Sequence, residues 1–159
     1  MNERHEAYLY HITFNAMHNL TPDDPKKMHA HTFCVGIYVI EEQEDHPIFV
    51  SCENALKRYF DRYRGIRLNE LSPFNETLPT LENMGEVFYG DLKSVFKRNG
   101  MNLLLLEMGD SPISTYCIGE RPMLGNVYSL VQKKAMDEYC ERVRQRYAEG
   151  EEEVDWLDD

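Results

Sequence analysis

Two strand-like segments near the start of the chain limit the folds that it can adopt. Residues 8–16 alternate apolar and polar side chains, which predicts a half-buried strand. Residues 32–40, TFCVGIYVI, are rich in β-branched and aromatic residues and predict a second strand. A loop at residues 21–27, which contains two prolines, separates them. We therefore expect both strands to belong to one antiparallel sheet.

Two helices are predicted after this pair of strands. Apolar residues recur at helical spacing over residues 55–63, and Ser51 is the expected cap of this first helix. The same spacing recurs over residues 84–96, where Thr80 is the expected N-cap and Gly100 the expected end. Each helix therefore has one apolar side that can pack on the sheet.

Two further strands complete the predicted domain. Residues 103–108 and 114–118 have strand composition, and a turn at residues 109–112 separates them. The order strand, strand, helix, helix, strand, strand describes an α+β fold. The sequence thus predicts a four-stranded antiparallel sheet with two helices on one face.

The end of the chain carries a further helical pattern and an acidic segment. Residues 128–147 have amphipathic spacing that predicts an extra C-terminal helix. Residues 149–159 contain seven acidic residues and no basic one, which favours a solvated tail, although apolar residues within it also allow docking on a neighbour. We therefore divide the chain into a domain at 1–120, a helical extension at 121–148 and the acidic tail.

Charge and composition exclude several classes of protein. The net charge of −11 argues against nonspecific binding to nucleic acid. No apolar run approaches the roughly 20 residues that span a bilayer, and residues 1–6 lack the apolar core of a signal peptide. The four cysteines are far apart, without a C-x-x-C pair, and are interpreted as reduced thiols. We expect a cytoplasmic protein that binds neither nucleic acid nor membrane.

Three histidines near the ends of the first two strands form a candidate metal site. His29 and His31 lie two apart at the entrance to the second strand, where both side chains point to one side. His18 ends the first strand, and the short loop returns the chain to the pair. Three neutral imidazoles with an open fourth position are ligands of a catalytic zinc ion. The alternative is a polar strand end whose histidines bond to backbone.

Three short segments, two of which contain these histidines, follow a recognisable pattern. Residues 14–20, FNAMHNL, fit F-x-A-x-H-x-L, and residues 79–83, PTLEN, fit P-T-x-E-N. Residues 29–33, HAHTF, fit H-G-H-aromatic, with Ala30 in place of glycine. These motifs resemble those of the 6-pyruvoyltetrahydropterin synthase and 6-carboxytetrahydropterin synthase family, and the similarity extends in the family's order over residues 8–119.

The resemblance implies a fold, an assembly and a set of site residues. The family has the tunnelling fold, in which subunits join their sheets edge to edge into a barrel with active sites at subunit junctions. By resemblance we expect Zn²⁺ at the three histidines and a homo-oligomer, as a hexamer of two trimers. Glu107, followed by Tyr116, matches the family glutamate that holds the pterin ring, a task that suits a carboxylate because it accepts two parallel hydrogen bonds. Thr80 and Glu82 are expected to cap the helix and complement its dipole, with ligand contact as the alternative.

The chain departs from the family at the residues that transfer protons. The family cysteine, four residues before the paired histidines, is Pro25 here, and the family's Asp-His dyad falls on Arg64 and Gly65. Proline has no ionisable group, and side-chain acid–base catalysis contributes about 10²–10⁴-fold in rate. Asp23 and Asp24, in the loop that leads to the histidines, are the candidate catalytic replacements.

Two functions follow from these residues. The first is a zinc-dependent pterin lyase or synthase that acts on 7,8-dihydroneopterin triphosphate or a related pterin, in tetrahydrobiopterin, queuosine or folate biosynthesis. The second is a catalytically inactive or repurposed module that binds metal and pterin and serves in assembly. The intact histidines and Glu107 favour the enzyme, whereas the missing acid–base residues favour the module.

Overall fold

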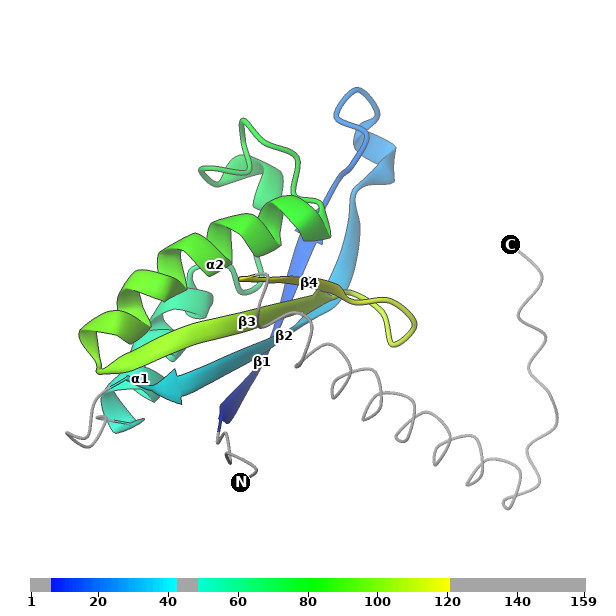
Figure 1. The fold of residues 1–159 in the computed structure, drawn as a ribbon. Coiled ribbons are helices and arrows are strands. Elements are labelled where there is room, and N and C mark those ends of the chain that lie inside the picture. Colours follow the sequence, from blue (N-terminus) through cyan, green and yellow to red (C-terminus); the bar gives the residue numbers. More distant parts are fainter. Residues whose placement is uncertain (1–6, 43–48, 121–159) are drawn as a thin grey trace, which may run out of the picture. The chain divides into compact units, whose positions relative to one another are not determined.

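The computed structural model describes residues 7–42 and 49–120 of the chain (Figure 1). The predicted helix at residues 128–147 and the acidic tail at 149–159 lie outside these described residues. None of the helices that the structure describes is long and apolar enough to cross a membrane.

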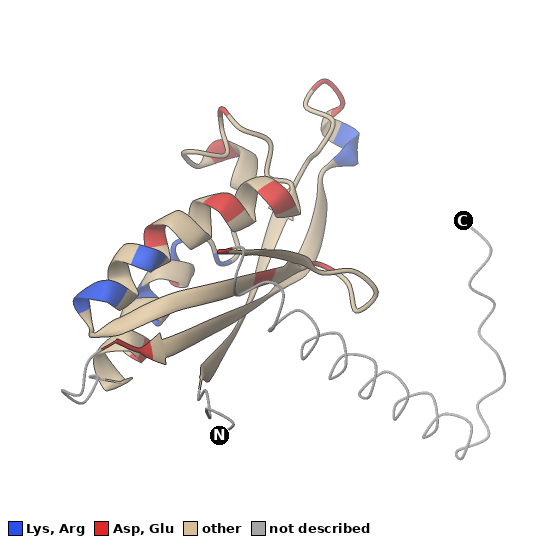
Figure 2. Cartoon of the chain, viewed as in Figure 1, with Lys and Arg blue, Asp and Glu red and all other residues tan. Residues whose placement is uncertain are grey.

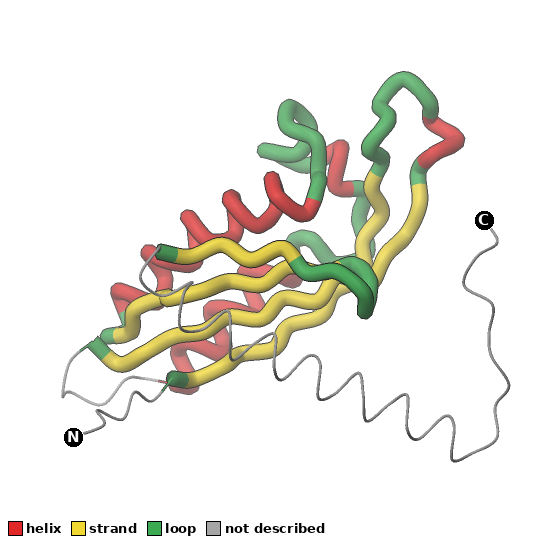
Figure 3. The backbone as a smooth tube through the Cα atoms, turned by 45° about the vertical axis from the view of Figure 1, so that its right-hand side comes forward, coloured by secondary structure: helices red, strands yellow, loops and turns green. Residues whose placement is uncertain are grey.

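The described residues form one sheet with helices on one of its faces (Figures 1 and 3). The sheet is antiparallel, with its strands in chain order. The elements are β1 (Tyr8–His18), β2 (His29–Glu41), α1 (Phe49–Asp61), α2 (Leu81–Arg98), β3 (Met101–Gly109) and β4 (Tyr116–Gly119). The predicted α+β fold, a four-stranded antiparallel sheet with two helices, is confirmed.

β1 and β2 extend further toward their connecting loop than the apolar pattern predicts. β1 continues past Ala16 to His18, and β2 begins at His29 instead of Thr32. The ladder is regular along this stretch and pairs His18 directly with His29. Backbone hydrogen bonds hold a ladder together whether or not the side chains are apolar, so apolar patterning underestimates its length. The histidines therefore lie on paired strands, at the strand ends where the sequence predicts them.

Aromatic side chains fill the space between the sheet and the helices. The ring of Phe14 in β1 lies 5.3 Å from Phe33 in β2 and 5.7 Å from Phe60 in α1. Phe88 of α2 packs edge-on against Phe14 at 6.1 Å. All four rings are buried, and truncation of a buried Phe to Ala costs about 3–5 kcal/mol. This core fixes the end of the sheet that carries the histidines.

The ends of α2 follow the sequence prediction, whereas the start of α1 does not. Thr80 caps α2, because its side-chain oxygen accepts a hydrogen bond from the Asn83 N–H at 3.2 Å. Gly100 follows the helix with a φ of 74°, a conformation that suits glycine. Ser51, expected as the cap of the first helix, lies inside the first turn of α1 instead. The apolar spacing begins late in this helix, which misplaced the predicted start.

Candidate metal site

The structure brings His18, His29 and His31 together at one end of the sheet. His18 pairs with His29 across the ladder and Ala16 pairs with His31, so the three side chains share one face. The ring of His18 lies 4.6 Å from that of His29 and 5.2 Å from that of His31. One ring nitrogen from each histidine lies within 4.8 Å of the other two. Side-chain rotations can bring three nitrogens at this spacing to one ion.

Backbone carbonyls orient two of the three rings. Nδ1 of His18 lies 2.8 Å from the carbonyl oxygen of Pro79, and Nδ1 of His29 lies 2.8 Å from that of Lys27. A carbonyl oxygen only accepts hydrogen bonds, so Nδ1 carries the proton in both rings. The free lone pair is then on Nε2 in both rings. Such carbonyl contacts orient metal-ligating histidines in many proteins.

The environment of the Nε2 atom of His18 points to a metal ion. This nitrogen is buried and has no hydrogen-bond partner in the part of the chain that the structure describes. A buried polar atom without a partner is costly, and a bound cation satisfies it. The donor set of three imidazoles fits zinc, which binds histidine nitrogen and leaves a fourth position open in catalytic sites.

The environment of His18 keeps its imidazole neutral. Burial lowers the pKa of His18 below its ordinary value, and the proximity of His29 and His31 lowers it further. A hydrogen bond to the Pro79 carbonyl and the charge of Asp110 act in the opposite direction, and the balance remains downward. Metal binding requires a deprotonated imidazole, so this environment favours a ligand state at neutral pH.

An asparagine pair, which sequence reasoning missed, fixes the chain directly after His18. The side chain of Asn69 accepts from the Asn19 backbone N–H and donates to the Asn19 carbonyl, both at 2.8 Å. The Asn19 side chain is 4% exposed and donates to the Asp24 carbonyl at 2.9 Å. A partner so far along the chain leaves no local signal. The pair holds the entrance of the loop that separates His18 from His29.

The two aspartates predicted as catalytic candidates are placed differently. Asp24 caps the short 3₁₀ helix η1 (Pro25–Lys27), because its Oδ1 accepts from the Lys26 N–H at 3.1 Å. Asp23 is exposed at the surface of the same loop. Asp110, which sequence reasoning missed, is the carboxylate whose charge acts on His18. Asp110 lies three positions after Glu107, and side chains alternate between the faces of a sheet along a strand. This alternation is the sequence signal that could have placed Asp110 on the face opposite to Glu107.

Glu107 lies on the opposite face of the sheet from the three histidines. It pairs with Gly36, and a Cβ atom placed on Gly36 would lie 2.9 Å from Oε2 of Glu107. The neighbours of Gly36 in β2, Val35 and Ile37, face the helices, so Gly36 and Glu107 face away from them. Oε1 of Glu107 accepts a hydrogen bond from the Tyr38 hydroxyl at 3.1 Å. One chain therefore does not bring Glu107 to the histidines.

Thr80 and Glu82 lie at the start of α2, beside the carbonyl that orients His18. Pro79, whose carbonyl accepts from His18, directly precedes Thr80. The Thr80 oxygen is used in capping, and Glu82 is exposed in the first turn of the helix. The start of α2 is thus a structural neighbour of the histidines, and capping is the role that the contacts of Thr80 display.

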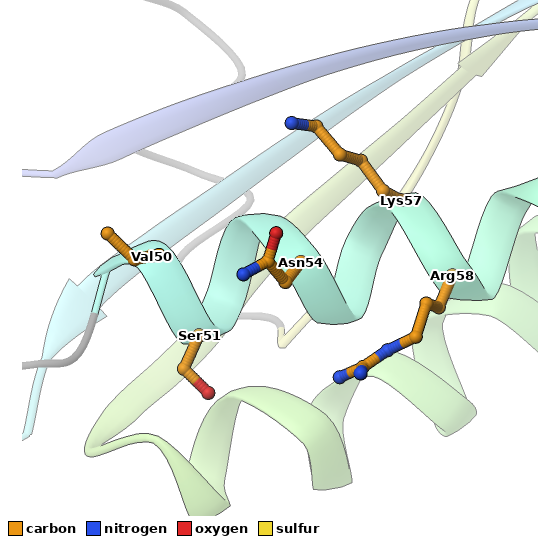
Figure 4. Close-up of a pocket in the computed structure, with 5 residues that line it drawn as sticks. All are labelled: Val50, Ser51, Asn54, Lys57 and Arg58. Atoms are coloured by element: carbon orange, nitrogen blue, oxygen red, sulfur yellow. The ribbon is translucent and has the colours of Figure 1, made fainter.

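Two surface hollows differ in their relation to the histidines. The larger, about 470 Å³, lies on α1, and Figure 4 shows that its side chains do not converge on one point. The smaller, about 350 Å³, includes His29 and two lysines of the loop, a basic segment that Figure 2 shows in blue. Its lining is Leu20, Thr21, Lys26, Lys27, Met28 and His29. We place the candidate site at the smaller hollow because only there does a lining residue belong to the histidine cluster.

Comparisons with known proteins show the family and the fold of this chain. The sequence model of the 6-pyruvoyl tetrahydropterin synthase family matches residues 9–120. The structure is similar to that of 6-pyruvoyl tetrahydropterin synthase from Caenorhabditis elegans, with a TM-score of 0.60 and 13% identity over 72% of this chain and 95% of that one. It is also similar to an uncharacterized protein from Wolinella succinogenes, with a TM-score of 0.50 and 16% identity over 74% of this chain and 100% of that one. No curated protein matches the sequence.

Proposed function

Because the chain belongs to the 6-pyruvoyl tetrahydropterin synthase family, we propose that it is a zinc-dependent pterin lyase or synthase of the cytoplasm. Its substrate in this proposal is 7,8-dihydroneopterin triphosphate or a related pterin. The observation that carries the proposal is the buried Nε2 of His18, which has no hydrogen-bond partner among the described residues, in a cluster where one ring nitrogen from each of the three histidines lies within 4.8 Å of the other two.

The chain's own residues divide the work of this site. Carbonyls of Pro79 and Lys27 fix the tautomers of His18 and His29, so that both rings offer Nε2 to the metal. Phe33 lies under the cluster, with its ring 5.2 Å from that of His18, and limits water on the core side. A bound zinc ion would supply Lewis acidity, which polarises a substrate oxygen and eases proton loss from the adjacent carbon.

Glu107 would hold the pterin ring, and it would do so for the site of a second copy. Within one chain it pairs with a residue five positions beyond His31 in β2, about 17 Å along the strand and on the other face. β1 and β4 are the two edges of the sheet, and edge-to-edge joining of copies would cover both. This arrangement supports a homo-oligomer, which we propose to be a hexamer of two trimers.

Turnover of the expected substrate tests the proposal. Purified protein with zinc is incubated with 7,8-dihydroneopterin triphosphate, and loss of triphosphate or cleavage of the side chain is followed by mass spectrometry. We expect turnover that the His29→Ala variant abolishes. His11→Ala is the matched control, because His11 is exposed on the other face of β1. Equal activity of both variants and the wild type would refute the metal site.

A second candidate function is a module that binds metal and pterin without turnover. It is favoured by Pro25, which replaces the family cysteine, and by Gly65, whose backbone N–H donates to the Asn15 carbonyl at 2.6 Å where the family has an ionisable dyad. Quenching of pterin fluorescence without turnover, lost in Glu107→Ala, would identify this function.

A further inference from the structure

Asp110 lies on the same side of the sheet as the three histidines. Leu106 and Met108 of β3 belong to the core between sheet and helices. Side chains alternate along a strand, so the next residue of this series, Asp110, follows on the helix-facing side. The residue is half-buried, directly after the last residue of β3.

The strand register places Asp110 next to the aromatic residue under the cluster. Gly109 pairs with Cys34 of β2, so Asp110 is level with Phe33. The ring of Phe33 lies 5.2 Å from that of His18 and 5.8 Å from that of His31.

The strand register places Asp110 beside Phe33, next to the cluster, and Asp110 does not belong to the cluster. The group of ligand atoms within 4.8 Å of one another contains only the three histidines among the described residues. A carboxylate that is near a metal but outside its ligand set leaves room for a substrate carbon between the two. This is the position that a general base needs, provided that it comes within hydrogen-bond reach of the bound substrate.

His18 and His29 have no ring nitrogen left for proton transfer once they hold a metal. Nδ1 of His18 and of His29 donates to a backbone carbonyl, and Nε2 of each is the ligand atom. Pro25 occupies the position of the family cysteine and has no proton to exchange. Asp24 accepts from the Lys26 N–H as a cap. The site therefore requires a proton carrier from another element.

We propose that Asp110 is the acid–base residue of this site, an assignment that rests on the proposed function. Its carboxylate takes a proton from the substrate carbon held beside the histidines. The C–H bond breaks, its electron pair is delocalised into the adjacent carbonyl or imine group, and an O–H bond forms on Asp110. Return of that proton to a neighbouring atom of the substrate restores the carboxylate, so no oxidant or further reactant is required.

The test compares Asp110→Asn with Asp61→Asn, which removes the same charge from an exposed residue at the end of α1 that pairs with Arg64. Zinc-loaded proteins are mixed with 7,8-dihydroneopterin triphosphate in D₂O, and deuterium incorporation into the side chain is measured by mass spectrometry. We expect incorporation to slow at least about 100-fold in Asp110→Asn and to stay within about twofold in Asp61→Asn.

Metal binding supplies a readout that does not depend on activity. Cobalt spectra and chelator competition are recorded for the same variants. We expect an unchanged cobalt spectrum in Asp110→Asn and a zinc affinity lowered only several-fold, because a nearby charge is lost and no ligand is lost. A changed spectrum would make Asp110 a ligand and overturn the assignment.

The outcomes separate this assignment from the proposed function. Wild-type incorporation together with equally fast incorporation in Asp110→Asn overturns the role of Asp110 alone. A wild-type protein that binds zinc and pterin but incorporates no deuterium overturns both the lyase proposal and the acid–base role. A wild-type protein that takes up no zinc refutes the metal site on which both depend.

Discussion

The two faces of one sheet carry the two halves of the candidate site. On the helix-facing side, one ring nitrogen from each of three histidines lies within 4.8 Å of the other two at the end of β1 and β2. On the other side, Glu107 lies over Gly36 and accepts a hydrogen bond from Tyr38. Side chains alternate between the two faces along a strand, so the position of a residue in its strand decides on which face of the sheet it lies. The chain thus carries the three histidines, the metal half of the proposed site, and Glu107, its carboxylate half, on opposite faces of its sheet.

The strongest test of this difference is to substitute one residue on each face of the sheet and to measure zinc affinity in both variants. We expect His29→Ala to lower zinc affinity by more than the roughly 10–100-fold that mutation of an outer contact costs, because a direct ligand is lost. Glu107→Ala should keep the zinc affinity of the wild type. Competition with a chromogenic chelator measures both. A similar loss in Glu107→Ala would mean that the two halves are one site within a chain.

Mixing the two variants tests whether the halves of different copies meet. His29→Ala and Glu107→Ala are each expected to be inactive alone. Unfolded together and refolded, they should regain about a quarter of wild-type turnover, because half of the copies supply intact histidines and half supply an intact glutamate. Each variant refolded by itself is the control. A mixture as inactive as its components would contradict a site shared between copies.

A change at Gly36 should affect the carboxylate half only. A Cβ atom in Gly36→Ala would lie 2.9 Å from Oε2 of Glu107, and the flexible end of that side chain must move away. We expect pterin affinity to fall about tenfold and the free energy of unfolding to change by less than about 1 kcal/mol, because only the flexible end of a side chain has to move. Pterin fluorescence titration measures the first and urea unfolding the second. Gly90→Ala, where an added Cβ meets nothing within 4 Å, is the control.

The sequence predicts the elements of this molecule better than their pairing. Hydrophobic spacing indicates the four strands and two helices, and the spacing of His29 and His31 already places both side chains on one face. The contact of His18 with the Pro79 carbonyl and the clamp between Asn19 and Asn69 join distant segments. Such contacts depend on packing of the whole domain and have no local pattern.

Asp110 shows where sequence reasoning stopped short of what alternation allows. Attention to the loop before His29 favoured Asp23 and Asp24, which are near the histidines in sequence. Asp110 follows a strand that sequence reasoning ended at Met108, two residues before it. Its relation to His18 becomes visible only with the register that pairs Gly109 with Cys34. Proximity along the chain was a poorer guide than strand register.

The smallest expected effect concerns the pH dependence of the metal-free protein. Burial lowers the pKa of His18 in the folded state, whereas the unfolded chain titrates near its ordinary value of about 6.5. Between these two pKa values the unfolded state binds more protons, so the free energy of unfolding falls as the pH falls through this window. The contribution of neutral His18 to the free energy of unfolding is fully present above about pH 6.5. Below that pH, the free energy of unfolding changes by at most about 1.4 kcal/mol per pH unit for one proton.

The His18→Asn variant should lose this slope while Glu107→Gln, on the other face, retains it. Urea unfolding of metal-free protein from pH 7.5 downward in small steps gives the free energy at each pH, and the difference in slope between wild type and variant isolates His18. An unchanged slope in His18→Asn would mean that its imidazole is as easily protonated in the fold as in the unfolded chain. That result would remove the electrostatic reason for a neutral imidazole at His18. The metal half and the carboxylate half would then differ in their position on the sheet and no longer in this electrostatic property.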